Sequence, residues 1–137
     1  MAEQIQFELV SPERLLLSRP VDMVVVPGAE GDFGAMPQHA PFISTLRPGI
    51  VAVFENGQAT ERLFVAGGFA EVTPERCTVL AERALPVGEL NREQAEAELR
   101  DARDDVLEAK EERERAEAER RVAVAEAMID AMGTLPY

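Results

Sequence analysis

The stretch IVAVFENGQATERLFVA, residues 50–66, decides the fold of the larger part of this chain. Two apolar segments flank Asn56-Gly57, a pair that favours the positive φ angles of a tight hairpin turn, so the stretch predicts two antiparallel strands. Similar short apolar segments, separated by Gly, Pro, Asn and Asp, recur about every ten residues up to about residue 86. This pattern is typical of an all-β sandwich or barrel of about eight to ten strands.

Upstream of the hairpin the sequence predicts at least two more strands. Ile5, Phe7 and Leu9 alternate with polar residues, as in a strand with one buried face. SPER at residues 11–14 predicts a turn. The β-branched run at residues 21–26 predicts one well-buried strand.

Downstream, Gly67-Gly68 is expected to separate the hairpin from a further strand, FAEVT. TPER at residues 73–76 then leads into a predicted strand at residues 77–85, CTVLAERAL. The single cysteine, Cys77, has no partner for an intramolecular disulfide, and we expect it to be a buried core residue.

The chain changes character after residue 90. Residues 91–132 contain no Gly or Pro and are rich in Ala, Glu and Arg, which predicts helix. Asn91 and Gln94 resemble a capping box at its start, and Gly133 suits its far end. Two thin apolar stripes flank a charged middle: Ala95, Leu99, Ala102 and Val106, then Val122, Ala125, Ile129 and Met132.

A fold-back near residues 110–115 would let these stripes meet in a two-helix hairpin. Because alanine buries little apolar area, the predicted hairpin is weak. We therefore expect two domains, a β-sandwich at residues 1–87 and a mobile helical domain at residues 88–137.

The charge balance limits the partners. The chain has 14 Lys and Arg against 26 Asp and Glu, for a net charge of −12, which opposes binding to nucleic acid or to anionic lipid surfaces. No apolar run reaches the ~18 residues of a membrane helix, and the first residues lack the features of a signal peptide. We expect a soluble, cytoplasmic protein.

The segment VVPGAEGDFGAMPQHAPF, residues 25–42, contains the strongest candidates for chemistry. Its glycines are three residues apart, which fits neither a phosphate-binding loop nor a dinucleotide fingerprint. The only histidine, His39, lacks both a nucleophile at the expected spacing and further metal ligands. We therefore predict no catalytic residue, cofactor or metal, and interpret the segment as a surface shaped for a protein partner.

The string VVVPGAEGDFGAMPQHAPFISTLRPGIV resembles the epsilon subunit of bacterial F-type ATP synthase, the counterpart of the mitochondrial delta subunit. The most specific part is Pro27 to Gly49, in which Gln38 stands where the family usually has Gly. FVAGGFAEV and CTVLAE continue the likeness, which covers the whole chain.

The resemblance implies a ten-stranded β-sandwich followed by a helical hairpin. It also implies a non-catalytic central-stalk subunit of the proton-translocating enzyme, peripheral at the cytoplasmic face of the bacterial inner membrane, that couples c-ring rotation to the catalytic head through the gamma subunit. Two segments would face the polar loops of the c-ring: Glu30, Gly31 and Asp32, and His39 and Ala40.

The family's helices can extend into the alpha/beta head and impede ATP hydrolysis, and some members bind ATP through an apolar-Asp-x-x-Arg-Ala motif. The matching stretch LNREQA has Asn91 and Gln94 in place of the acid and the arginine, so we expect no ATP binding. Beyond Arg121 the only charged residues are Glu126 and Asp130, and our hypothesis is that the brake on hydrolysis is weak or absent.

Two alternatives belong to other functional classes. A sandwich adaptor with a coiled-coil tail requires sustained heptads of large apolar residues, which the middle of the tail lacks. A small hydrolase using His39 with Ser44 and a carboxylate would turn over substrate alone, and no nucleophile-base spacing supports it.

Overall fold

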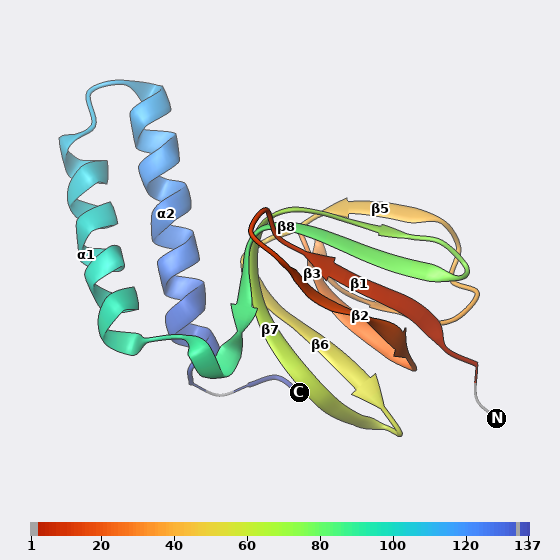
Figure 1. The fold of residues 1–137 in the computed structure, drawn as a ribbon. Helices are drawn as coiled ribbons and strands as arrows, with labels where there is room; N and C mark the ends of the chain where they lie inside the picture. The colour runs from red at the N-terminus through yellow and green to blue at the C-terminus, as the bar shows by residue number, and fades with distance from the viewer. Residues whose placement is uncertain (1–2, 134) are drawn as a thin grey trace. The chain divides into compact units, whose positions relative to one another are not determined.

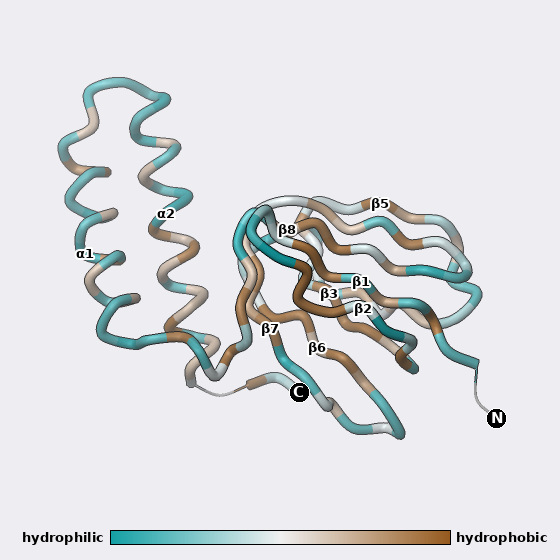
Figure 2. Tube along the Cα trace, in the orientation of Figure 1, coloured by the Kyte–Doolittle hydropathy of each residue, from teal (hydrophilic) through white to brown (hydrophobic). Residues whose placement is uncertain are grey.

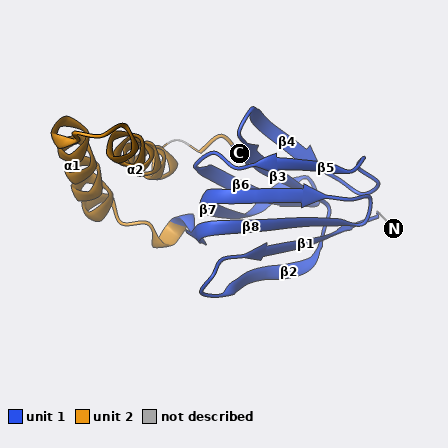
Figure 3. Cartoon of the chain, turned by 90° about the horizontal axis from the view of Figure 1, so that it is seen from above, with its two compact units in different colours: residues 1–87, 137 blue, residues 88–136 orange. Residues whose placement is uncertain are grey.

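The computed structural model describes residues 3–133 and 135–137 of the chain, which divides into two compact units (Figures 1 and 3). Residues 1–87 with residue 137 form the sandwich unit, and residues 88–136 form the helical unit. The strands are β1 (Ile5–Val10), β2 (Leu15–Val21), β3 (Met23–Gly28), β4 (Gly31–Ala35), β5 (Phe42–Thr45), β6 (Gly49–Glu55), β7 (Gln58–Val72) and β8 (Arg76–Pro86). The helices are η1 (Val87–Glu89), α1 (Arg92–Glu108) and α2 (Glu112–Ala131).

The strands form a continuous hydrogen-bonded sheet in the order β2-β1-β8-β7-β6-β3-β4, with β5 also paired to β7. The sheet folds over on itself, so that its two layers enclose the core (Figure 1). Strand β7 pairs with β6 over its first half and with β5 over its last residues, so it belongs to both layers. The predicted β-sandwich class is confirmed.

The described residues contain eight strands where the resemblance implied ten, because two of the strands are long. Gly67 and Gly68, with φ angles of 72° and 99°, bend β7 without ending it, and its ladder with β8 resumes at Gly68 and Ala81. A Cβ atom at Gly68 would lie 1.9 Å from the Leu80 carbonyl oxygen. The glycine pair is therefore a bend inside one strand and not the break that the sequence predicted.

The turn chemistry of the sequence is confirmed at the central hairpin. Asn56 and Gly57 both have positive φ angles, 55° and 78°, and join β6 to β7. Ser11 and Arg14 close their turn with two backbone hydrogen bonds of 2.9 and 3.3 Å. Local backbone preference decided these connections.

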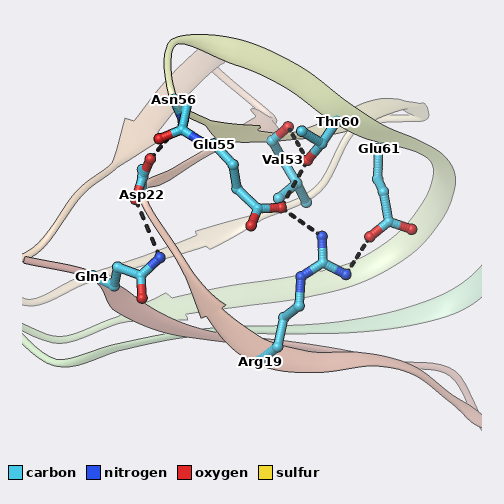
Figure 4. Close-up of polar contacts among 8 residues, drawn as sticks. All are labelled: Gln4, Arg19, Asp22, Val53, Glu55, Asn56, Thr60 and Glu61. Atoms are coloured by element: carbon cyan, nitrogen blue, oxygen red, sulfur yellow. Dashed lines mark hydrogen bonds and ion pairs between the residues drawn. The ribbon is translucent and has the colours of Figure 1, made fainter. Parts of the chain in front are cut away.

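One predicted strand is divided. Residues 21–26 belong to two strands, since β2 ends at Val21 and β3 begins at Met23. The Asp22 carboxylate between them accepts hydrogen bonds from the backbone N–H of Asn56 (2.7 Å) and from Gln4 Nε2 (3.2 Å), as Figure 4 shows. These long-range contacts turn the chain where local propensity favours a straight strand.

The sandwich core contains large apolar side chains. Ile5, Phe7 and Leu9 are fully buried, as their alternation predicted. Cys77 is buried as well, and its burial raises the pKa of the thiol to about 12.

A polar bridge closes the sandwich between β2 and the β6–β7 hairpin (Figure 4). Arg19 on β2 forms ion pairs with Glu55 of β6 (2.7 Å) and Glu61 of β7 (2.5 Å). The hydrogen bond from Arg19, followed by one from Thr60, lowers the pKa of the Glu55 carboxyl. The bridge connects β2 to residues of the β6–β7 hairpin that are distant from it in sequence.

In the helical unit, α1 and α2 form the expected hairpin. The fold-back lies at residues 109–111, at the early edge of the predicted turn, and Glu112 already begins α2. Asn91 caps α1, because its Oδ1 accepts a hydrogen bond of 2.9 Å from the Gln94 backbone N–H. Neither helix in the described part of the chain has the length and apolar character needed to cross a membrane.

The hairpin buries mainly alanine. Figure 2 shows that α1 and the first half of α2 are largely hydrophilic. Val122, Ile129 and Met132, which the sequence placed in the apolar seam, are only half-buried, because the closest approach of the helices selects small side chains. The buried residues are Ala95, Ala102, Ala118, Ala125, Met128 and Ala131.

Candidate partner-binding surface

The turn between β3 and β4 presents the first group of predicted partner-binding residues. Glu30 and Gly31 are exposed, and Gly31 has a φ of 138°, a conformation that favours glycine. Strands β3 and β4 remain paired up to Gly28 and Gly31, so the turn is tight. The Glu30 side chain is displayed from a well-defined backbone.

Asp32, the third residue of this group, already has partners within the sandwich unit. Its carboxylate forms an ion pair with Arg47 and accepts a hydrogen bond of 2.7 Å from the Tyr137 hydroxyl. Burial opposes ionisation, but the hydrogen bonds from Tyr137 and Arg47, with the Arg47 charge, lower the pKa of the Asp32 carboxyl. Arg47 also donates to the Gly28 carbonyl (2.7 Å), which braces the turn.

The second predicted group lies in the connection between β4 and β5, beyond the other end of β4. His39 is half-buried, and its Nδ1 lies 2.5 Å from the Ala40 carbonyl oxygen. Gln38 has a φ of 65°, in the left-handed region, which accounts for the glycine usual here in the family that the chain resembles. Its backbone N–H donates to the Pro74 carbonyl (2.7 Å).

The structure therefore does not bring the two predicted groups into one cluster. Glu30, Gly31 and Asp32 lie before and at the start of β4, whereas His39 and Ala40 follow its end. An edge-to-face contact between Phe33 and Phe42, 5.0 Å between ring centroids, joins β4 to β5 between them. Within residues 3–133 and 135–137, no group of side chains has the composition and spacing of a metal site.

A second surface feature was not predicted from the sequence. Four apolar residues pair across neighbouring strands: Phe69 with Leu80, Leu80 with Val10, and Val10 with Leu15. Their strand neighbours Ala70, Val79 and Leu9 are buried in the core, so the four side chains point away from it. We call Leu15, Val10, Leu80 and Phe69 the outer-face row, together with Ile43, whose strand partner Glu71 lies two residues along β7 from Phe69.

The outer-face row is unusually exposed for such large residues. Leu15 is 58% exposed, Ile43 66%, Phe69 42% and Leu80 40%. The next positions along the strands are polar and include Glu8, Thr78 and Glu71, which pair across the same strands. An apolar row with a polar margin is typical of a protein-protein interface.

The sequence held only a weak signal for this row. Leu80 and Phe69 occupy the outward positions of strands that are also apolar on the inward side. Their alignment depends on the register of β1 with β8 and of β8 with β7, which joins residues some 70 positions apart in the chain, as Val10 and Leu80 are.

The chain is similar to known proteins over nearly its whole length. The family model for the ATP synthase delta/epsilon chain, beta-sandwich domain, matches residues 4–87. An ATP synthase epsilon chain from Paramagnetospirillum magneticum is 58% identical over 132 residues, which cover 96% of this chain and 99% of that one. One from Rhodospirillum rubrum is 56% identical over 131 residues, with 96% and 98% covered.

Solved structures show the same fold. A chain of the Euglena gracilis mitochondrial ATP synthase OSCP/F1/c-ring structure matches with a TM-score of 0.81 at 25% identity, over 94% of this chain and 81% of that one. A chain of the Tetrahymena thermophila mitochondrial ATP synthase central stalk/c-ring structure matches in fold with a TM-score of 0.72 at 12% identity, over 96% and 99%. The chain belongs to the ATP synthase delta/epsilon chain family, whose epsilon chains are non-catalytic stalk subunits of the enzyme complex.

Proposed function

We propose that this chain couples rotation of the c-ring to the catalytic head of a proton-translocating ATP synthase by binding the gamma subunit, at the cytoplasmic face of the bacterial inner membrane. The observation that carries the proposal is the outer-face row, in which Leu15, Leu80, Phe69 and Ile43 stay exposed and Val10 is half-buried between them. Such a surface is stabilised when a partner covers it.

The two surface features favour different partners. The outer-face row is apolar and suits a permanent interface with another soluble subunit, for which we propose gamma. The turn at Glu30 is exposed and charged, and it suits the polar loops of a c-ring. Asp32, His39 and Ala40 stay predictions for the same contact, with Asp32 engaged by Arg47 and Tyr137 in the free chain.

Co-purification from solubilised membranes of the source organism tests both assignments. A tagged wild-type chain is expected to recover gamma and c subunits. Leu80→Glu places a charge in the outer-face row and is expected to reduce recovery of gamma at least tenfold, because burying an unpaired carboxylate is costly. The double change Glu30→Ala and His39→Ala is expected to reduce recovery of c subunits and to leave gamma bound.

The matched control is Leu107→Glu, on the helical hairpin, where the leucine is 84% exposed. It adds the same charge outside the outer-face row and is expected to leave recovery of gamma unchanged. Loss of gamma with Leu107→Glu and not with Leu80→Glu would contradict the assignment of the row. Recovery of neither subunit by the wild type would favour the adaptor hypothesis.

A weak regulatory role is a separate proposal. The only charged residues after Arg121 are the acids Glu126 and Asp130, so the second half of α2 offers no basic side chain to the catalytic head. We therefore propose that the helices impede ATP hydrolysis only weakly. Hydrolysis by the complex with and without residues 88–137 is expected to differ by less than about twofold. A several-fold rise on truncation would show that the brake is strong.

A further inference from the structure

Tyr137 belongs to the sandwich unit, although 49 residues of the helical unit precede it. Its hydroxyl donates to Asp32 Oδ2 (2.7 Å), and its main-chain oxygen accepts from Arg62 Nε (2.9 Å). Its ring meets Phe54 edge to face, with 5.8 Å between centroids and an interplanar angle of 87°. The three contacts come from β4, β7 and β6, and the tyrosine is 37% exposed.

The residues that contact Tyr137 are held in place by other contacts within the sandwich unit. Arg47 orients the Asp32 carboxylate and is itself bound to the Gly28 carbonyl. The hydrogen bond to Asp32, with burial and the negative charge of Asp32, raises the pKa of the Tyr137 phenol. The site therefore fits an amphipathic ring with a donor at its tip.

We infer that Asp32, Phe54 and Arg62 form a docking site for Tyr137, and that its occupation keeps the helical hairpin folded. The argument rests on chain length. If α1 and α2 merged into one straight helix from Arg92 to Ala131, that helix would be about 60 Å long. Six residue steps join Ala131 to Tyr137, and they span at most about 20 Å.

The other end of the helix is tethered equally closely. Six steps join Arg92 to Pro86, which pairs with Leu63, the neighbour of Arg62. Even with both linkers fully stretched back along the helix, about 20 Å would have to be spanned by the separation of Pro86 from the Tyr137 site, although Pro86 pairs with the residue next to Arg62. A docked Tyr137 and an open, straight hairpin therefore exclude each other, and docking shifts the population toward the folded hairpin.

The docking can be measured directly, because Tyr137 is the only tyrosine and the chain has no tryptophan. The charged groups around the phenol are Asp32 and Arg47. Absorbance titration of the full-length chain is expected to give a midpoint above that of free tyrosine, about 10. Asp32→Asn is expected to lower the midpoint, and the exposed control Glu75→Gln to leave it in place. A wild-type midpoint at the free value would overturn the docking.

Hydrogen exchange of the same full-length chain tests the hold on the helices. Tyr137→Ala is expected to speed exchange of the α2 amides about tenfold, with a smaller effect for Tyr137→Phe, which keeps the ring contact with Phe54. The sandwich amides are expected to exchange as in the wild type. Unchanged α2 exchange in both variants would overturn the proposal, as would faster exchange across the whole sandwich, since Tyr137 would then be a structural part of it.

Discussion

The sandwich and the helical hairpin bury apolar surface in different ways. The sandwich core contains Phe7, Ile5 and Leu9, all fully buried, whereas the hairpin seam is alanine with a single methionine, Met128. A large apolar side chain contributes roughly 1.5–3 kcal/mol on burial, and an alanine methyl a fraction of that. The hairpin is therefore the region that can open while the sandwich keeps its shape.

Ion pairs between the helices change this balance little. Arg121 meets Asp105 at 2.5 Å and Arg103 meets Glu126 at 3.5 Å, and all four side chains are about half exposed. Exposed pairs of this kind contribute roughly 0–1 kcal/mol each. The contrast between the two units thus rests on side-chain size.

The largest effect is expected in the sandwich core. Phe7→Ala removes a fully buried ring and should lower the free energy of unfolding of the sandwich by about 3–5 kcal/mol. Leu107→Ala, at an exposed position of α1, is the control and should change it by less than about 0.5 kcal/mol. Urea unfolding measures both. If Phe7→Ala and Leu107→Ala lowered the free energy of unfolding equally, the difference in burial between the two units would not explain their stability.

A smaller effect should be confined to the helices. Ala118 on α2 is only 1% exposed, so Ala118→Leu forces a large side chain into a packed position. This overpacking should destabilise the hairpin by about 1–3 kcal/mol. Hydrogen exchange resolved by segment should show faster exchange of the α1 and α2 amides and an unchanged exchange rate in the strands. Faster exchange throughout would mean that the two units unfold together.

Alkaline pH should weaken the sandwich through Cys77. Because the folded-state pKa of its thiol is raised to about 12 from 9.0, stability is complete below about pH 9 and declines as the pH rises toward 12. At pH 10 the expected loss is about 1 kcal/mol. The Cys77→Ala variant should lack this pH-dependent loss of stability. If the wild type loses no more stability at pH 10 than Cys77→Ala does, the thiol is not held protonated by burial.

The smallest expected effect concerns the start of α1. Asn91→Ala removes the bond to the Gln94 backbone N–H and should cost the helix about 1 kcal/mol. Circular dichroism of thermal unfolding measures the loss of helix. Asn91→Ser retains a capping oxygen and should restore most of the stability; if it does not, the cap is not the reason for the loss.

Local chemistry predicted much of the fold. Asn56-Gly57 identified the central hairpin, and the alternation of Ile5, Phe7 and Leu9 identified a core strand, because both depend on near neighbours. The Gly67-Gly68 prediction was wrong, since a glycine pair can end a strand or bend it, and only the ladder with β8, which resumes at Gly68, distinguishes the two.

The long-range features could not be predicted. The bridge from Arg19 to Glu55 and Glu61 joins residues about 40 positions apart, and many other pairings of charges were equally compatible with the sequence. The outer-face row exists only once the strand register is set. The partner residues Glu30 and His39 came from family resemblance, and they stay predictions.

The central claim is that the sandwich uses its outer-face row to bind a stalk partner. Cys77 is buried and protonated at neutral pH, so Leu15→Cys, Phe69→Cys and the control Gln58→Cys each add one reactive thiol. Each is labelled with a photoreactive maleimide and assembled into the membrane-derived complex. We predict a covalent product with gamma, identified by mass spectrometry, from Leu15→Cys and Phe69→Cys and not from Gln58→Cys. Products from Gln58→Cys alone would contradict the claim.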